Sequence, residues 1–306
     1  MLKISLKPAL TALAITAIFP SSAFACACGC SIFDVGTASM LPSGLGTTLF
    51  LEYDYLNQTT NWSGGSSAPG ANNDDKKIRS DYVVFGAQHN FNSDWSMTVK
   101  LPFLHRGLLA ADSGAPEEFD HTSLGDVRLM VSYSGLSSDG STGVIGGVKL
   151  PTGDTDVPNF ESDTQNGTGS TDIMLGVYHT SQLTTDGQFN YYGQVMWQHE
   201  VATQNHYVPG SELNGALGVS YAGWAIGNTM ISPVLQAIVS YRGHDGGLAG
   251  DPGNTGYARL LISPGIKADF GTWKLYADVE VPVAQNVEGN QLISPVALKF
   301  VASYAL

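Results

Sequence analysis

Long apolar runs are missing from this 306-residue chain beyond its first 25 residues. A helix that crosses a membrane needs about 18 or more consecutive apolar residues, so the sequence excludes a membrane protein built from spanning helices. The 3.6-residue periodicity of amphipathic helices is also missing after the first 20 residues. Soluble globular proteins of this size usually contain such helices, so their absence argues against that class.

Charge is also scarce, and positive charge most of all. Charged residues make up 13% of the chain, and the formal net charge is −13. A nucleic-acid-binding surface needs a basic patch, so we expect no nucleic-acid partner. One explanation for acidic residues in loops is that solvent-exposed loops carry charge. The alternative is that they bind cations that bridge to lipopolysaccharide, or that they attract cations to a pore mouth. The acids of the expected loops are Asp74, Asp75, Asp112, Glu117, Glu118, Asp120, Asp154, Asp156, Glu161 and Asp163.

Only three cysteines are present, Cys26, Cys28 and Cys30. Three thiols at this spacing suit Cu(I) or Zn(II), and cysteines this close rarely form an unstrained disulfide with each other. The odd number leaves at least one thiol free or intermolecular. One hypothesis is therefore a metal site at these cysteines. The other is that cleavage or modification alters the cluster and the rest is incidental.

The first 25 residues have the features of an export signal. Lys3 and Lys7 precede an apolar segment, and Ala23-Phe24-Ala25 fits the small-x-small cleavage rule. We expect a signal peptide over 1–25 and a cysteine-containing periplasmic leader over 26–45. A lipid-modified Cys26 is a weaker alternative, because Ala23 replaces the usual aliphatic residue.

Alternation between apolar and polar residues is the pattern that the sequence does contain. Leu129 and Val131 alternate with Arg128 and Ser132, which places the two kinds of side chain on opposite faces of a strand. A soluble core would not place Arg128 so deep in a strand, whereas a membrane barrel has one face against lipid and one against water. Strand patterns cover 46–58, 78–91, 95–104, 124–135, 142–152, 170–182, 187–200, 211–223, 228–243, 255–269, 271–283 and 292–306.

The lengths of the connections alternate along the chain. Those after even-numbered segments are short, such as 92–94, and most after odd-numbered ones are long, such as 105–123 and 153–169. Bacterial outer-membrane barrels have short periplasmic turns, longer outer loops and an even number of strands. We therefore predict an all-β fold over 46–306, a transmembrane antiparallel up-and-down β-barrel of about twelve strands, in the bacterial outer membrane with both termini periplasmic. An aromatic girdle is expected near the short turns, from Phe91, Trp95, Tyr133, Tyr178, Tyr221, Phe270, Trp273 and Tyr304.

The same register turns a set of charged side chains toward the barrel interior. They either form charge rings that set the ion preference of a pore or fill the interior as pairs that support the wall. A twelve-strand barrel lies between filled eight-strand barrels and open porins, so the strand number does not decide. The candidate pore-lining residues are Glu52, Asp54, Lys100, Asp126, Arg128, Lys149, Asp172, Lys267, Lys274, Asp278, Glu280 and Lys299, with Arg242 and Asp269 in the same register.

Four segments resemble a known family. They are GDVRL at 125–129, GVKLPTGD at 147–154, NGTGSTDIMLGVY at 166–178 and ADVEVPV at 277–283. They are similar to segments of the outer-membrane proteins labelled meta-pathway of phenol degradation. The resemblance covers about 45–306 and implies a closed barrel of porin type that passes small hydrophobic or aromatic compounds. It supplies no catalytic residues, and the cysteine leader is not part of the family pattern.

We predict a passive outer-membrane channel for small molecules. The alternative is a structural barrel whose leader binds metal or a periplasmic redox partner. A third hypothesis, a lipid-acting enzyme using His121 and Ser123, lacks an orienting partner, so we expect no enzyme. Other expected partners are outer-membrane lipid, lipopolysaccharide and the barrel assembly machinery, since the last strand alternates as far as Tyr304.

Overall fold

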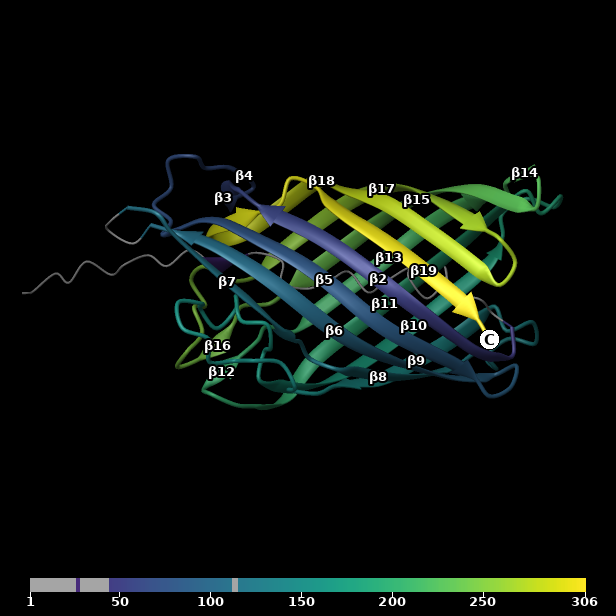
Figure 1. Ribbon diagram of the computed structural model, residues 1–306, viewed down its shortest axis with the longest axis horizontal. Coiled ribbons are helices and arrows are strands. Elements are labelled where there is room, and N and C mark those ends of the chain that lie inside the picture. The colour runs from purple at the N-terminus through teal and green to yellow at the C-terminus, as the bar shows by residue number, and fades with distance from the viewer. Residues whose placement is uncertain (1–25, 28–43, 112–114) are drawn as a thin grey trace, which may run out of the picture.

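The computed structural model describes residues 26–27, 44–111 and 115–306. Its main sheet closes on itself because the last strand pairs antiparallel with the first long one. Twelve strand positions form the wall (Figure 1), which confirms the predicted all-β up-and-down barrel. In order they are β2 (Gly46–Gln58), β5 (Asp75–Asn90), β6 (Trp95–Ala110), β7 (Glu117–Leu124) with β8 (Arg128–Tyr133), β9 (Thr142–Lys149), β10 (Ser170–Gln182), β11 (Phe189–Thr203), β13 (Glu212–Tyr221), β15 (Thr229–Arg242), β17 (Tyr257–Asp269), β18 (Trp273–Ile293) and β19 (Ala297–Ala305).

Period-two alternation decides which side chains face outward. On β2, Phe50 and Glu52 are buried inside the barrel, whereas Leu49 and Leu51 are exposed on its outer surface. An exposed apolar surface on this scale is what a lipid-facing wall requires. No helix of the described residues is long and apolar enough to span a membrane. Exposed apolar side chains of the wall include Phe85, Leu101, Phe103, Val131, Leu175, Val177, Val195, Leu217, Leu235, Val239, Ile266, Leu275, Val279 and Phe300.

The two ends of the barrel differ. Short turns and the C-terminus lie at one end, which we call the short-turn end, and the β3 (Thr60–Gly64), β4 (Ser66–Ser67), β12 (Tyr207–Val208) and β16 (Gly246–Gly247) segments lie at the other, the long-loop end (Figure 1). Aromatic rings pair at the short-turn end. The centroids of Trp95 and Tyr133 are 4.7 Å apart, and those of Trp273 and Tyr304 are 4.9 Å apart. The predicted girdle is therefore assembled from neighbouring strands.

Several strands are longer at the long-loop end than predicted. The expected loop 105–123 instead contains the end of β6 and all of β7, which pair with each other. The expected loop 284–291 continues β18, which there pairs with β3. Alternation persists in these extensions, for example at Arg106 and Leu108, both buried on the inner face. The predicted boundaries stopped where the lipid-facing apolar pattern ends.

The predicted strand 124–135 is interrupted. β7 ends at Leu124, opposite Phe103 of β6, and β8 begins at Arg128, opposite Lys100, so the gap faces Leu101 and Pro102. Gly125 N donates to Pro102 O over 2.7 Å, and Asp126 is released from the ladder to make the contacts described below. Two short strands also belong to the sheet. The three-residue β14 (Trp224–Ile226) lies at the short-turn end, and β1 (Cys26–Ala27) pairs parallel with β18 at Gln291–Leu292.

Pro233 lies inside β15, although proline cannot donate to a sheet ladder. On one side of β15 the pairing with β13 ends at Val234 and the pairing with β14 begins at Ile231. Pro233 therefore falls in a gap of that ladder, where no N–H is required. Ser232 uses its side chain there instead, donating from Oγ to Ala222 O over 2.9 Å.

Candidate functional site

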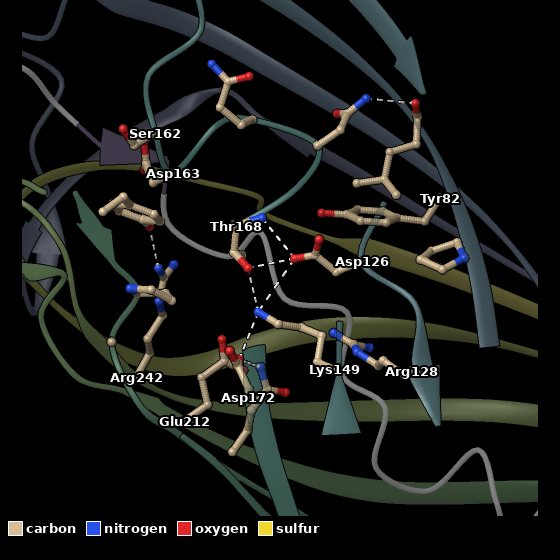
Figure 2. Close-up of a pocket in the computed structure, with 18 of the residues that line it drawn as sticks. Tyr82, Asp126, Arg128, Lys149, Ser162, Asp163, Thr168, Asp172, Glu212 and Arg242 are labelled. Atoms are coloured by element: carbon tan, nitrogen blue, oxygen red, sulfur yellow. Dashed lines mark hydrogen bonds and ion pairs between the residues drawn. The ribbon is translucent and has the colours of Figure 1, made fainter. Parts of the chain in front are cut away.

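A cavity occupies the lumen toward the long-loop end, and we call it the vestibule. β5, β6, β8, β9, β10, β13 and β15 contribute to its wall, and the β9–β10 connection also lines it (Figure 2). The predicted residues Lys100, Asp126, Arg128, Lys149 and Asp172 all line the vestibule. Four of them belong to strands of the wall, whereas Asp126 lies in the break between β7 and β8; that they line a pore stays a prediction.

Lys149 is the centre of one network in the vestibule. Its Nζ lies 2.8 Å from Asp172 Oδ2 and 3.6 Å from Asp126 Oδ2, and donates to Thr168 Oγ1 (2.6 Å) and Ser170 Oγ (3.0 Å) (Figure 2). Lys149, Asp126 and Asp172 are all buried. Charges taken out of water are tolerated when paired and hydrogen-bonded, and this network meets both conditions.

A second network joins β2, β6 and β19. Lys299 Nζ lies 2.9 Å from Glu52 Oε1 and 3.0 Å from Asp54 Oδ1, and Lys100 Nζ lies 3.2 Å from Glu52 Oε2. These residues come from strands at the two ends of the chain, so the network closes the barrel seam from inside. The structure thus brings four more of the predicted charges into contact with one another.

The remaining predicted charges lie elsewhere in the interior. Asp278 Oδ2 accepts from Gln236 Nε2 (2.9 Å) and Tyr276 OH (2.6 Å), and Glu280 is buried two residues further along β18. Lys267 and Lys274 lie toward the short-turn end. There Lys274 Nζ is 3.3 Å from Asp269 Oδ2, and the side chains of Lys274 and Asp269 are partly exposed. These groups are not part of the vestibule.

The β9–β10 connection, residues 150–169, folds into the barrel instead of extending from it, and we call it the inner loop. Asp126 holds both of its ends, accepting from Gly153 N (3.1 Å), Thr168 N (2.9 Å) and Thr168 Oγ1 (2.6 Å). Asn166 Nδ2 donates to Leu104 O over 3.1 Å. The segment from Asp163 to Asn166 is buried. The inner loop therefore narrows the lumen.

Two glycines permit this fold of the inner loop. A Cβ on Gly167 would lie 2.4 Å from the backbone of Gly153, and a Cβ on Gly153 would lie 2.6 Å from Gly167. Only glycine allows two backbones to approach so closely. Both residues belong to the glycine-rich segments on which the family resemblance rests, so these segments specify the inner loop.

Below the vestibule, toward the short-turn end, a large apolar cluster lies in the interior beside buried polar groups such as Gln236 and Asp278. Met174, Ile238 and Leu261 are 1–2% exposed and belong to one cluster that extends around the wall from β8 to β19. We call this cluster the collar. Its members are Met130, Ile145, Met174, Tyr192, Met196, Ala216, Val234, Ile238, Leu261, Tyr276 and Val301. The collar was not predicted from the sequence, because the inward positions of a membrane barrel are expected to be polar.

Glycine on β9 gives the collar methionines their space. A Cβ on Gly147 would lie 2.8 Å from Met130 Cγ and 3.0 Å from Met174 Cε, and both methionines are cross-strand neighbours of Gly147. The two methionine side chains therefore pack over Gly147 on β9. The inward-facing Gly147, opposite a methionine on each neighbouring strand, was the available signal for this packing.

Other vestibule residues were also missed. Arg106 is 1% exposed and donates from Nη2 to Tyr82 OH over 3.0 Å. Its position was assigned to a loop, although the alternation of Leu104, Arg106 and Leu108 was the signal that β6 continues. Arg242, which the register did predict, pairs with Asp245 at 2.6 Å and fixes the β12–β16 sheet over the barrel mouth.

The cysteines of the metal hypothesis lie mostly outside the described residues, whereas the His121 and Ser123 pair, for which no catalytic role was expected, is described. Cys28 and Cys30 lie outside the described residues, as does the side chain of Cys26, so the metal hypothesis stays a prediction. Among the residues that the structure describes, no three His, Cys, Asp or Glu side chains are placed to hold a metal ion. His121 Nε2 lies 2.9 Å from Asp154 Oδ2, whereas Ser123 Oγ accepts from Asn166 Nδ2.

Comparison with solved structures supports the same fold. An outer-membrane channel from Pseudomonas putida F1 superposes with a TM-score of 0.62 at 12% identity, covering 87% of this chain and 97% of that one. The β-domain of the Bordetella autotransporter BrkA gives a TM-score of 0.51 at 12% identity, covering 86% and 100%. No protein-family profile matches the chain. No curated protein matches it either. At these identities the likeness establishes the fold, an outer-membrane type of β-barrel.

Proposed function

We propose that this protein is an outer-membrane channel that lets small molecules cross passively. The observation that carries the proposal is the divided lumen of a closed barrel, with a charged vestibule at the long-loop end and an apolar collar below it. A solid structural support would need no water-accessible cavity among buried charges. The fold shared with a Pseudomonas putida outer-membrane channel supports the same function.

The collar indicates the class of solute. Hydrophobic constrictions exclude ions because an ion must shed its hydration shell to enter them. Small, uncharged and largely apolar molecules do not meet this barrier. The resemblance to proteins labelled meta-pathway of phenol degradation points to the same class. We therefore propose hydrophobic or aromatic solutes, with no catalytic step.

The orientation belongs to the same proposal. Short turns face the periplasm in bacterial outer-membrane barrels, so the vestibule would open to the outside and both termini would lie in the periplasm. Lipopolysaccharide around the long-loop end, and the assembly machinery acting on the last strand, would be the partners. The export signal over 1–25 and the leader over 26–45 fit this location.

Electrical recording from the refolded mature protein in a planar bilayer tests the proposal. We expect discrete current steps of small and uniform size, because the collar restricts ions without sealing the lumen. Heat-modifiable migration in gels would verify folding of each preparation. A folded protein that gives no steps, and that transports no neutral solute into vesicles, would contradict the channel function.

A further inference from the structure

Exposed positive charge gathers at one place on the outer wall. Among the residues that the structure describes, the exposed Lys and Arg side chains are Lys76, Lys77 and Arg79, and every other Lys or Arg is buried or half-buried. All three lie at the start of β5, near the long-loop end (Figure 1). We call them the basic strip. The strip stands out in a chain whose formal net charge is −13.

A β-bulge at the start of β5 increases the positive charge on the outer face. The pairing of β5 with β6 shifts register between Asp75 and Lys77, so Lys76 is an additional residue there. Lys76 and Lys77 are both exposed, whereas Asp75 before them and Ile78 after them are buried. Bulges commonly re-aim a side chain in this way. Regular alternation would have turned one of the two lysines inward.

The pairing with β2 gives the depth of the strip in the wall. Tyr55 of β2 lies opposite Asp81 of β5, and Arg79 is two residues further toward the long-loop end. Below them on the same outer face, Leu51 and Phe85 are opposite each other and exposed. Aromatic girdles flank the apolar band of outer-membrane barrels, and Tyr55 has that position. The basic strip therefore lies just beyond the apolar band, at the level of lipid headgroups.

Arg79 is held in place but keeps donors for a ligand. Its Nε and Nη2 donate to the Asp81 carboxylate (2.8 Å and 3.1 Å), and its guanidinium carbon lies 5.5 Å from the centroid of the Tyr55 ring. The donors of Nη1 are left for another acceptor. On the β6 side, Arg79 is opposite Gly107, where a Cβ would meet nothing within 4 Å. An anion can therefore approach the guanidinium from that side.

We propose that the basic strip binds a phosphate group of lipopolysaccharide in the outer leaflet. Arginine binds phosphate through its planar guanidinium and lysine as a point charge, and phosphate is the anion that a lipid presents at headgroup depth. The acyl chains would lie against the exposed apolar wall below, where the rings of Phe85 and Phe103 are 5.9 Å apart. The inference rests on the proposed outer-membrane location and orientation, and not on conduction.

Acidic side chains limit the strip on one side. Glu118 and Asp120 of β7 are exposed, and each is opposite a β6 residue that is itself opposite the strip. The width of β6 thus separates these carboxylates from the strip. Because carboxylates repel phosphate, we expect the lipid headgroup over β2 and β5 and not over β7.

Calorimetric titration with lipid A tests the site. The mature protein would be refolded in detergent without lipopolysaccharide and titrated, in EDTA, with bisphosphorylated lipid A in the same detergent. EDTA removes divalent cations that could bridge acidic groups to the lipid. Each Lys or Arg beside an anionic lipid surface strengthens binding about fivefold, so the double variant Lys77→Gln, Arg79→Gln should bind at least about tenfold more weakly.

Two further variants sharpen this test. Lys77→Glu leaves the Arg79–Asp81 ion pair intact and should weaken binding by a similar factor. The matched control is Lys267→Gln, Lys274→Gln, which removes two charges inside the barrel toward the short-turn end and should leave the affinity unchanged. Heat-modifiable migration verifies that each variant is folded.

Three results would overturn the proposal. Equal affinity in the parent and both strip variants would place the lipid elsewhere. Equal binding of lipid A without its phosphates would mean that only acyl chains are recognised. Inorganic phosphate that binds as tightly as lipid A would indicate a site for free anions. A barrel that conducts without binding lipid A would contradict this site alone, and one that binds without conducting would contradict the channel function alone.

Discussion

The vestibule and the collar occupy one lumen but are stabilised in different ways. Lys149 in the vestibule holds two buried carboxylates and two hydroxyls, whereas Ile238 in the collar packs in a cluster of buried apolar side chains. Both face inward for the same geometric reason, the two-residue period of a strand. Alternation therefore fixes which residues face the lumen, and it does not fix whether the lumen is charged or apolar at a given depth.

The largest effect should follow loss of the vestibule's central charge. Lys149→Met leaves Asp126 and Asp172 buried without their cation, and breaking a buried ion pair in this way costs about 3–5 kcal/mol. The free energy of unfolding, measured by urea titration in lipid vesicles, should fall by that amount. Lys274→Met removes a partly exposed ion pair and should cost about 0–1 kcal/mol. Equal losses in the two variants would contradict the distinction between them.

Truncation of a collar side chain should lower the stability of the barrel and raise its conductance. Ile238→Ala removes a side chain that is 1% exposed, and such truncations cost about 2–5 kcal/mol. Widening the collar should also increase single-channel conductance. Leu235→Ala, on the lipid-facing side of the same strand, is the control and should leave conductance unchanged. If both variants conduct like the parent, the collar is not the narrowest point.

Release of the inner loop should have a smaller effect on stability. It should make the loop easier for protease to cleave and the lumen easier for ions to cross. Asp126→Asn keeps an acceptor oxygen for the inner loop but removes its charge, and a hydrogen bond to a charged group contributes about 1 kcal/mol more than one to a neutral group. We expect faster protease cleavage within 155–162 and a larger conductance. Asp156→Asn, in the same loop but without these contacts, should change neither. Unchanged cleavage in Asp126→Asn would show that other contacts hold the loop.

The smallest expected effect is a pH dependence at Glu161 of the inner loop. The pKa of Glu161 is raised to about 8 in the folded protein from a model-compound value of 4.5. The folded state therefore binds a proton that the unfolded state has lost between these two values, so the stability contribution decreases as pH rises from about 4.5 to 8. In EDTA the free energy of unfolding should fall over this range in the parent and remain flatter in Glu161→Gln. Parallel pH profiles would assign the dependence to another group.

Much of the wall could be predicted from local sequence. The segments 46–58 and 170–182 coincide with β2 and β10, because one face of each strand meets lipid and the other does not. The same register turned Lys100, Arg128, Lys149 and Asp172 of the vestibule inward. Strand ends beyond the lipid-facing band, as at Arg106, were missed because the outer apolar pattern no longer marks them.

The inner loop, the strand break and the collar could not be predicted this way. The contact between Asp126 and Thr168 joins residues 42 positions apart, and neither residue has a local pattern that specifies it. The collar depends on packing between Gly147, Met130 and Met174 on three strands. The periodicity of a single sequence describes one strand at a time. It therefore cannot predict which side chains fill the lumen that the twelve strands enclose.

The most direct test of a channel with an apolar collar is the selectivity of flux through proteoliposomes. Swelling rates would be compared for a neutral aromatic solute and a charged aromatic solute of similar size, with Ile238→Ala and Leu235→Ala measured in parallel. The account predicts faster entry of the neutral solute, and a gain in charged-solute entry in Ile238→Ala alone. Equal entry of both solutes into the parent, or faster entry of the charged one, would contradict it.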